Sequence, residues 1–262
     1  MEVHHHPDLH HRNKHWKEYF LEFLMIFLAV TMGFFAENIR ERISERGKEK
    51  EFIESMVADL KSDTANFRYY ILNGTAVTQK IDSLINMLRS QGKDTQTATL
   101  YYLARTISTK SYPVQMFDRT YSQMKSSGNL RILHVQSIAD SVTAYYYDAG
   151  LITSQQNFIN NFLLEYIKNV SVVFDAAVFQ KMYNHGLTMD SSANARFQYL
   201  IMPPDGNPAL SDESKPAINA LIGSIHFLYA RVINMNTIIS YENKKAALLI
   251  HLLQKEYHLE NE

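Results

Sequence analysis

Residues 19–36 read YFLEFLMIFLAVTMGFFA, and Glu22 is the only charged residue among them. A bilayer hydrocarbon core ~30 Å thick requires about 20 helical residues. The uncharged part, residues 23–36, covers only about 21 Å at ~1.5 Å per residue. We therefore predict a transmembrane helix over residues 16–38, with Glu22 inside the membrane or at its edge.

The N-terminal flank of this segment is typical of a membrane boundary. Trp16 and Tyr19 stand where interfacial aromatic side chains are expected, and basic residues precede or adjoin them: Arg12, Lys14 and Lys17. A cleaved signal peptide is the competing interpretation. The sequence ENIR at residues 37–40 follows the apolar run without a small-x-small cleavage site, so we expect a retained anchor.

One face of the predicted helix combines small residues with acidic ones. Its members recur at steps of three and four residues: Glu22, Ile26, Ala29, Gly33, Ala36 and Glu37. Ala29 and Gly33 form a small-xxx-small pair that lets two helices approach closely. A carboxylate within a membrane avoids lipid by facing a partner helix or water. Two interpretations stay open: self-association through this face, and a monomeric helix whose Glu22 extends to the headgroups.

The rest of the chain has the pattern of a helical protein. Residues 39–60 carry Glu, Arg and Lys at spacings that support a solvated helix, which predicts a helical stalk. Residues 61–262 are predicted to form a helical bundle domain. Apolar residues repeat there at helical spacing in several segments, namely 52–72, 81–88, 95–109, 117–125 and 135–182.

Local signals set the limits of these predicted helices. Asn73-Gly74 predicts a turn and hence a helical hairpin, and residues 186–213 predict a long loop. Ser214 can cap a last helix that reaches about residue 258, with Pro216 in its first turn. The predicted fold class is all-α: one N-terminal transmembrane helix that continues into a bundle of long antiparallel helices.

Composition argues against several function classes. The chain has 26 Lys and Arg residues against 27 Asp and Glu, so the strongly basic surface of nucleic-acid-binding proteins is not expected. It has no cysteine, which removes disulfides, thiolate nucleophiles and cysteine-based zinc sites. GxSxG, HExxH, P-loop and GxGxxG motifs are also missing from the sequence, so we expect neither an enzyme nor a cofactor.

The N-terminal tail, residues 1–15, is rich in histidine. Six imidazoles fall within it: His4, His5, His6, His10, His11 and His15. Imidazoles at this density can bind zinc, copper, nickel or iron. The alternative is a flexible tail that contacts lipid or a partner, because few carboxylates and no cysteine accompany the histidines. Both interpretations stay open.

A second candidate site follows the predicted helix at 117–125. An anion could be held by side chains and backbone amides of Lys125, Ser126, Ser127, Gly128 and Arg131. The alternative is structural: Gly128 ends the helix, and the apolar residues after it enter the core. Tyr145, Tyr146 and Tyr147 are interpreted in the same way, as packing residues on a long helix.

Three segments of the chain resemble a large bacterial family of single-span membrane proteins without an assigned function. They are residues 2–64, with the His-rich tail and EYFLEFLMIFLAVTMGFFAENIRE; residues 118–133, DRTYSQMKSSGNLRIL; and residues 140–148, DSVTAYYYD. The second of these is similar to the family's Leu-Lys-Ser-x-Gly-Asn-Leu-Arg element, which precedes a Tyr-Tyr helix. The family brings no known activity, catalytic residue or cofactor.

The resemblance implies a bacterial inner membrane protein with its N-terminus in the cytoplasm and its body in the periplasm. The residues alone leave this orientation open. Basic residues precede the span, but others follow it, namely Arg40, Arg42, Arg46, Lys48 and Lys50. The chain also departs from the family by placing histidines where its relatives carry a basic flank.

Two hypotheses for function follow. The first is a non-enzymatic, membrane-anchored sensor or scaffold that acts through self-association and an envelope protein partner. The second is an oligomeric cation channel lined by the face that carries Glu22, Ala29, Gly33 and Glu37. Both place the chain in the lipid bilayer as a homo-oligomer.

Overall fold

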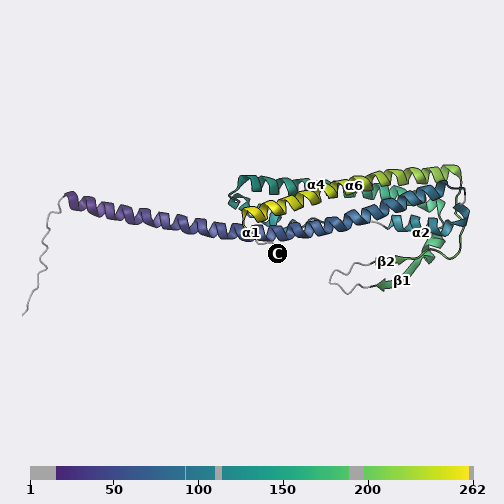
Figure 1. The fold of residues 1–262 in the computed structure, drawn as a ribbon, viewed down its shortest axis with the longest axis horizontal. Coiled ribbons are helices and arrows are strands. Elements are labelled where there is room, and N and C mark those ends of the chain that lie inside the picture. The colour runs from purple at the N-terminus through teal and green to yellow at the C-terminus, as the bar shows by residue number, and fades with distance from the viewer. Residues whose placement is uncertain (1–15, 92, 110–113, 189–197, 260–262) are drawn as a thin grey trace, which may run out of the picture. The chain divides into compact units, whose positions relative to one another are not determined.

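The computed structural model describes residues 16–91, 93–109, 114–188 and 198–259. The chain divides into two compact units, Met1–Phe52 and Ile53–Glu262. The helices and strands follow in this order: α1 (Trp16–Arg89), the 3-10 turn η1 (Lys93–Thr95), α2 (Thr97–Ser108), α3 (Arg119–Ser126), the 3-10 turn η2 (Asn129–Ile132), α4 (Gln136–Val173), α5 (Ala176–Lys181), β1 (Tyr183–Thr188), β2 (Gln198–Ile201) and α6 (Lys215–Glu256) (Figure 1). The predicted all-α class is confirmed, with one small β-hairpin added.

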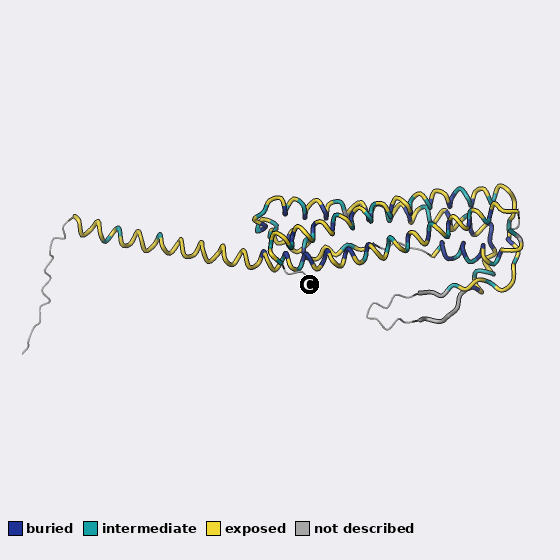
Figure 2. The backbone as a smooth tube through the Cα atoms, viewed as in Figure 1, coloured by how far each residue is buried: buried dark blue, intermediate teal, exposed yellow. Residues whose placement is uncertain are grey.

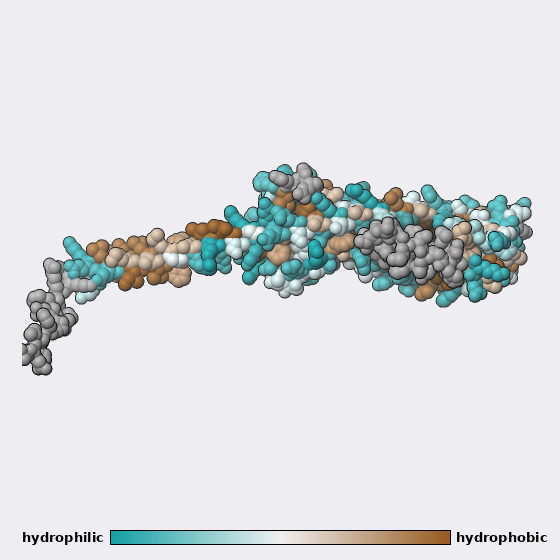
Figure 3. Space-filling model, turned by 90° about the horizontal axis from the view of Figure 1, so that it is seen from below, coloured by the Kyte–Doolittle hydropathy of each residue, from teal (hydrophilic) through white to brown (hydrophobic). Residues whose placement is uncertain are grey.

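The described part of the first unit is the N-terminal portion of α1, and its apolar side chains are exposed. Figure 3 shows them on the surface of this helix. The apolar window of α1 is fully exposed, and the helix is long and apolar enough to cross a membrane. α6 is also long and apolar enough, but part of its apolar stretch is buried because its side chains pack inside the second unit.

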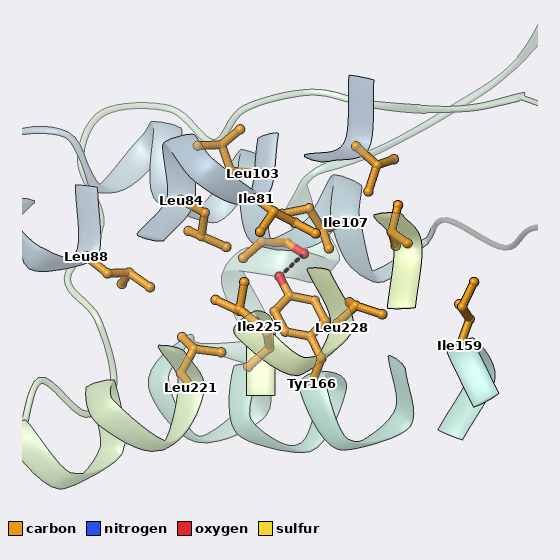
Figure 4. Packing of buried hydrophobic residues seen from close by; sticks show 14 of the residues in the cluster. Ile81, Leu84, Leu88, Leu103, Ile107, Ile159, Tyr166, Leu221, Ile225 and Leu228 are labelled. Atoms are coloured by element: carbon orange, nitrogen blue, oxygen red, sulfur yellow. Dashed lines mark hydrogen bonds between the residues drawn. The ribbon is translucent and has the colours of Figure 1, made fainter. Parts of the chain in front are cut away.

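The second unit is built around one hydrophobic core. Figure 2 shows that the long helices turn their buried residues toward one another. The core joins four helices, and Figure 4 labels Ile81, Leu84 and Leu88 from α1, Leu103 and Ile107 from α2, Ile159 and Tyr166 from α4, and Leu221, Ile225 and Leu228 from α6. The buried Tyr166 hydroxyl donates to the Ala104 carbonyl at 2.9 Å, which satisfies the one polar group that this ring brings into the core.

The helices of this unit do not all alternate in direction. α4 and α6 lie side by side and antiparallel, as Asn234 to Gln155 and Lys245 to Asp148 hydrogen bonds show. α1 runs in the same direction as α4 (Figure 1). The reason is that the chain returns along α1 before α4 begins, since Phe117 bonds Asp63 and the later residue Thr120 bonds the earlier residue Asp59.

The predicted turn at Asn73-Gly74 is wrong, because α1 continues through both residues. Gly74 is buried where α1 passes α6, and a Cβ atom on it would lie 2.6 Å from Cγ of Asn236. The Asn73 side chain donates to the Tyr69 carbonyl one turn earlier, within the helix. The glycine therefore serves close helix packing, and the hairpin expected after residue 72 does not form.

The segment predicted as a long loop, residues 186–213, is partly a β-hairpin. β1 and β2 pair antiparallel, with Tyr183 opposite Ile201. After β2 the chain follows α2, where the Tyr101 hydroxyl donates to the Ala209 carbonyl at 2.9 Å. Residues 189–197 lie outside the described part.

The other helix limits agree with the sequence signals. The Ser214 hydroxyl accepts from the Ala217 amide at 3.4 Å and caps α6, whose first turn contains Pro216. The predicted helix over 135–182 is the pair α4 and α5, and the Asp175 carboxylate caps α5 by accepting from the Ala177 amide at 2.8 Å.

Candidate functional site

Two buried acids of α1 hold the start of α3. Asp59 and Asp63 are one helical turn apart, and the described structure places the segment 117–120 against both. We call these two acids, together with residues 117–120, the acid clamp. Tyr145 of α4 also contacts Asp63.

Asp63 is completely buried, at 0% exposure, and both of its carboxylate oxygens have donors. Oδ1 accepts from the Phe117 amide at 2.7 Å, and Oδ2 accepts from the Tyr145 hydroxyl at 2.7 Å. The Tyr146 hydroxyl donates to the Phe117 carbonyl at 3.3 Å, so both groups of the Phe117 backbone are fixed. Such pairing is what makes a buried polar group tolerable.

Asp59 acts as a cap for α3 from another helix. Its Oδ2 accepts from the Thr120 amide at 2.9 Å and from the Thr120 hydroxyl at 2.6 Å. Its Oδ1 accepts from Arg119 Nη2 at 3.2 Å. Asp118 occupies the cap position of α3 but makes no cap hydrogen bond with its side chain, so Asp59 supplies the acceptor that the first amides of a helix need.

Burial shifts the acid–base properties of this cluster. Desolvation raises the pKa of Asp63 to about 6, the two hydrogen bonds oppose the rise, and the negative charges of Asp59 and Asp118 add to it. Desolvation and the charge of Asp63 also raise the pKa of Tyr145 and Tyr146, so both hydroxyls stay protonated near neutral pH.

α6 adds a third buried acid to the same region. Glu242 is only 1% exposed, and desolvation raises its pKa. Its Oε2 forms an ion pair with Lys245 Nζ at 3.7 Å. The same ammonium group also pairs with Asp148 of α4. The charge of Glu242 helps to raise the pKa of Tyr145, the residue that donates to Asp63.

The candidate residues of the predicted span all lie on α1. Ile26, Ala29, Gly33, Ala36 and Glu37 are exposed, and Glu22 is partly buried. A Cβ atom on Gly33 would meet nothing within 4 Å in this single chain, so the surface next to it is open. Self-association through this face and a pore along it both stay predictions. The six histidines proposed for metal binding lie outside the described residues.

The proposed anion site lies at the end of α3. Gly128 adopts a left-handed conformation with φ 70°, and the Ser126 and Ser127 hydroxyls donate back to the Gln123 carbonyl at 3.0 Å and 2.8 Å. Lys125 Nζ lies 6.0 Å from the centre of the Tyr121 ring. These contacts favour the helix-ending interpretation, and anion binding by Lys125, Gly128 and Arg131 stays a prediction.

Sequence reasoning missed the acid clamp and Glu242. A signal was present: Asp59 and Asp63 stand among Met56, Leu60 and Phe67 on the apolar face of α1, where a carboxylate needs a partner. The partner could not be identified, because its amides belong to a segment about 60 residues away.

No family model, no curated protein and no solved structure matches this chain.

Proposed function

We propose that this chain is a non-enzymatic, membrane-anchored helical module of the bacterial inner membrane that works as a sensor or scaffold. It acts through an envelope protein partner and through self-association. The observation that carries the proposal is that α1 combines a fully exposed apolar window with core residues of the helical body in one uninterrupted helix.

Transfer of the apolar window of α1 from water into lipid is favourable, because the gain from its apolar side chains exceeds the cost of its one charge. An apolar side chain such as Leu, Ile or Phe gains ~1.5–3 kcal/mol when it is removed from water. A charged side chain at the bilayer centre costs ~2.5–3.5 kcal/mol on insertion scales. The exposed set includes Phe23, Ile26 and Phe27, so a few such residues outweigh the single acid Glu22.

The body supports a role in transmission or assembly more than a role in chemistry. The buried carboxylates Asp59 and Asp63 accept hydrogen bonds from backbone amides and hydroxyls, so they fix helices to one another. The helix that carries them is also the one that carries the apolar window. A ligand or partner that moves α3 or α4 would therefore act directly on α1.

Membrane orientation is part of the proposal, with the body in the periplasm. The absence of cysteine makes it testable by single introduced cysteines. In intact bacteria, a membrane-impermeant maleimide should label Ser122→Cys, because that position is exposed on α3. Lys17→Cys, on the other side of the span, should react only after the cells are opened. The reverse pattern would place the body in the cytoplasm and end the periplasmic assignment.

A further inference from the structure

We infer that Asp63 is a proton-responsive element of the acid clamp, and that protonation of Asp63 tightens the hold of α1 on residues 117–120. This inference names the stimulus of the proposed sensor and rests on that proposed function for its biological use. The proton response itself belongs to the second unit alone.

The geometry isolates Asp63 from solvent while linking it to two elements. The Phe117 amide donates to one carboxylate oxygen and the Tyr145 hydroxyl to the other, each at 2.7 Å. A backbone amide can only donate, but a tyrosine hydroxyl can donate or accept. The bond from Phe117 therefore keeps its direction on protonation but loses the assistance of the charge, whereas the bond to Tyr145 can reverse its direction.

The groups around Asp63 are mostly acidic. Asp59 on α1 and Asp118 before α3 repel its charge, and Tyr145 and Tyr146 of α4 are neutral. On α6, the charge of Glu242 acts on Tyr145, and Lys245 pairs with both Glu242 and Asp148. The cation within the clamp is Arg119, whose side chain is 75% exposed and is bound to Asp59. Removal of the Asp63 charge thus relieves repulsion and leaves no cation unpaired.

Protonation at Oδ2 lets Asp63 donate to the Tyr145 oxygen, and the Tyr145 hydroxyl hydrogen becomes available to another acceptor. A proton taken up by Asp63 therefore removes a buried charge that Asp59 and Asp118 repel, while the link between α1 and α4 is kept. Most surface carboxylates act in the opposite sense, because they lose ion pairs when acid neutralises them.

The sign follows from linkage. The pKa of Asp63 is raised from 3.8 to about 6 in the folded chain, so the folded state binds more protons than the unfolded state between these values. Stability from this group is therefore fully present below the unfolded value and is lost as pH rises through about 6.

The test uses the full-length chain in detergent micelles. Infrared spectra over a pH titration should show a protonated carboxylic acid that loses its proton near pH 6 and is missing from Asp63→Asn. In Tyr145→Phe the same band should titrate at higher pH, because a hydrogen bond that favours the charged form is gone. Amide exchange at residues 117–120, corrected for the intrinsic rate, should be slower below this pH than above it.

Asp82→Asn is the matched control, because Asp82 is an exposed carboxylate of the same helix. It should keep the wild-type titration and the wild-type exchange. The inference is overturned if Asp63→Asn retains the band, or if the band titrates near 3.8 in wild type. Unchanged exchange at residues 117–120 across the titration also overturns it. If Asp63→Asn does not fold, the wild-type and Tyr145→Phe titrations decide. None of these results depends on membrane insertion or orientation. They therefore test the proton response of Asp63 independently of the proposed membrane anchor and its orientation.

Discussion

Gly74 of α1 lies directly against the side chain of Asn236 of α6, and a Cβ atom on Gly74 would come within 2.6 Å of the Asn236 Cγ. Two helices that are far apart in sequence thus meet where one of them has no side chain. This contact explains why a residue that usually weakens a helix stands inside a helix as long as α1.

Gly74→Ala should displace the Asn236 amide, so it should lack the gain of roughly 0.5–1 kcal/mol that alanine brings at an open helix position. Denaturant unfolding of the detergent-solubilised protein measures this difference. Gly47→Ala is the matched control, since a Cβ there meets nothing within 4 Å and should stabilise the helix by roughly 0.5–1 kcal/mol. If both variants gain stability, Gly74 does not mark a close contact.

Loss of the cap that Asp59 provides should weaken α3. Asp59→Ala removes the acceptor for the Thr120 amide and hydroxyl, and we expect a loss of about 1–2 kcal/mol. It also removes a negative charge that raises the pKa of Asp63, so that acid should titrate at lower pH. Calorimetric unfolding and the infrared titration measure the two effects. Asp82→Ala, which removes an exposed carboxylate of α1, should change neither.

The buried acid gives the fold an unusual pH dependence. A pKa raised from 3.8 to about 6 corresponds to a contribution of about 3 kcal/mol to the free energy of unfolding. Asp63 makes this contribution in acid, and the contribution is lost near neutral pH. Other carboxylates contribute their own pH dependence, so the relevant quantity is the difference between wild type and Asp63→Asn. Unfolding curves at several pH values should show that this variant is the more stable one near neutral pH and that the advantage vanishes in acid. A constant difference would contradict the linkage.

Self-association through the small-residue face predicts a defined mass in detergent. Gly33→Leu should reduce that mass, because a large side chain separates the backbones of two helices. Leu28→Phe, about 140° away on a helix of ~3.6 residues per turn, should leave the mass unchanged. A monomeric wild type would remove self-association from the account, and a closed ring of about four or more copies would favour the cation channel over the scaffold.

The parts of the fold that local chemistry controls were predictable. Ser214 and Pro216 predict the start of α6, and Gly128 predicts the end of α3, because each acts on amides or carbonyls a few residues away. The apolar window of α1 is visible for the same reason, since every member lies within one run of sequence.

The parts that depend on distant contacts were not predictable. Asn73-Gly74 has the pattern of a turn, but the contact with Asn236 outweighs it. The acid clamp could be predicted only from the three-dimensional fold, because the chain must first return and place residues 117–120 beside α1. A carboxylate on an apolar helix face predicts that a hydrogen-bond donor lies nearby. The sequence does not identify which of the many backbone amides is that donor.

The central claim is that the apolar window of α1 is more stable in lipid than in water, and membrane extraction tests it most directly. After expression of the full-length chain, membranes are washed with alkaline carbonate and then with detergent. We expect the protein to stay with the membranes through the carbonate wash and to dissolve only in detergent. A folded, monodisperse protein in the aqueous fraction without detergent would contradict it.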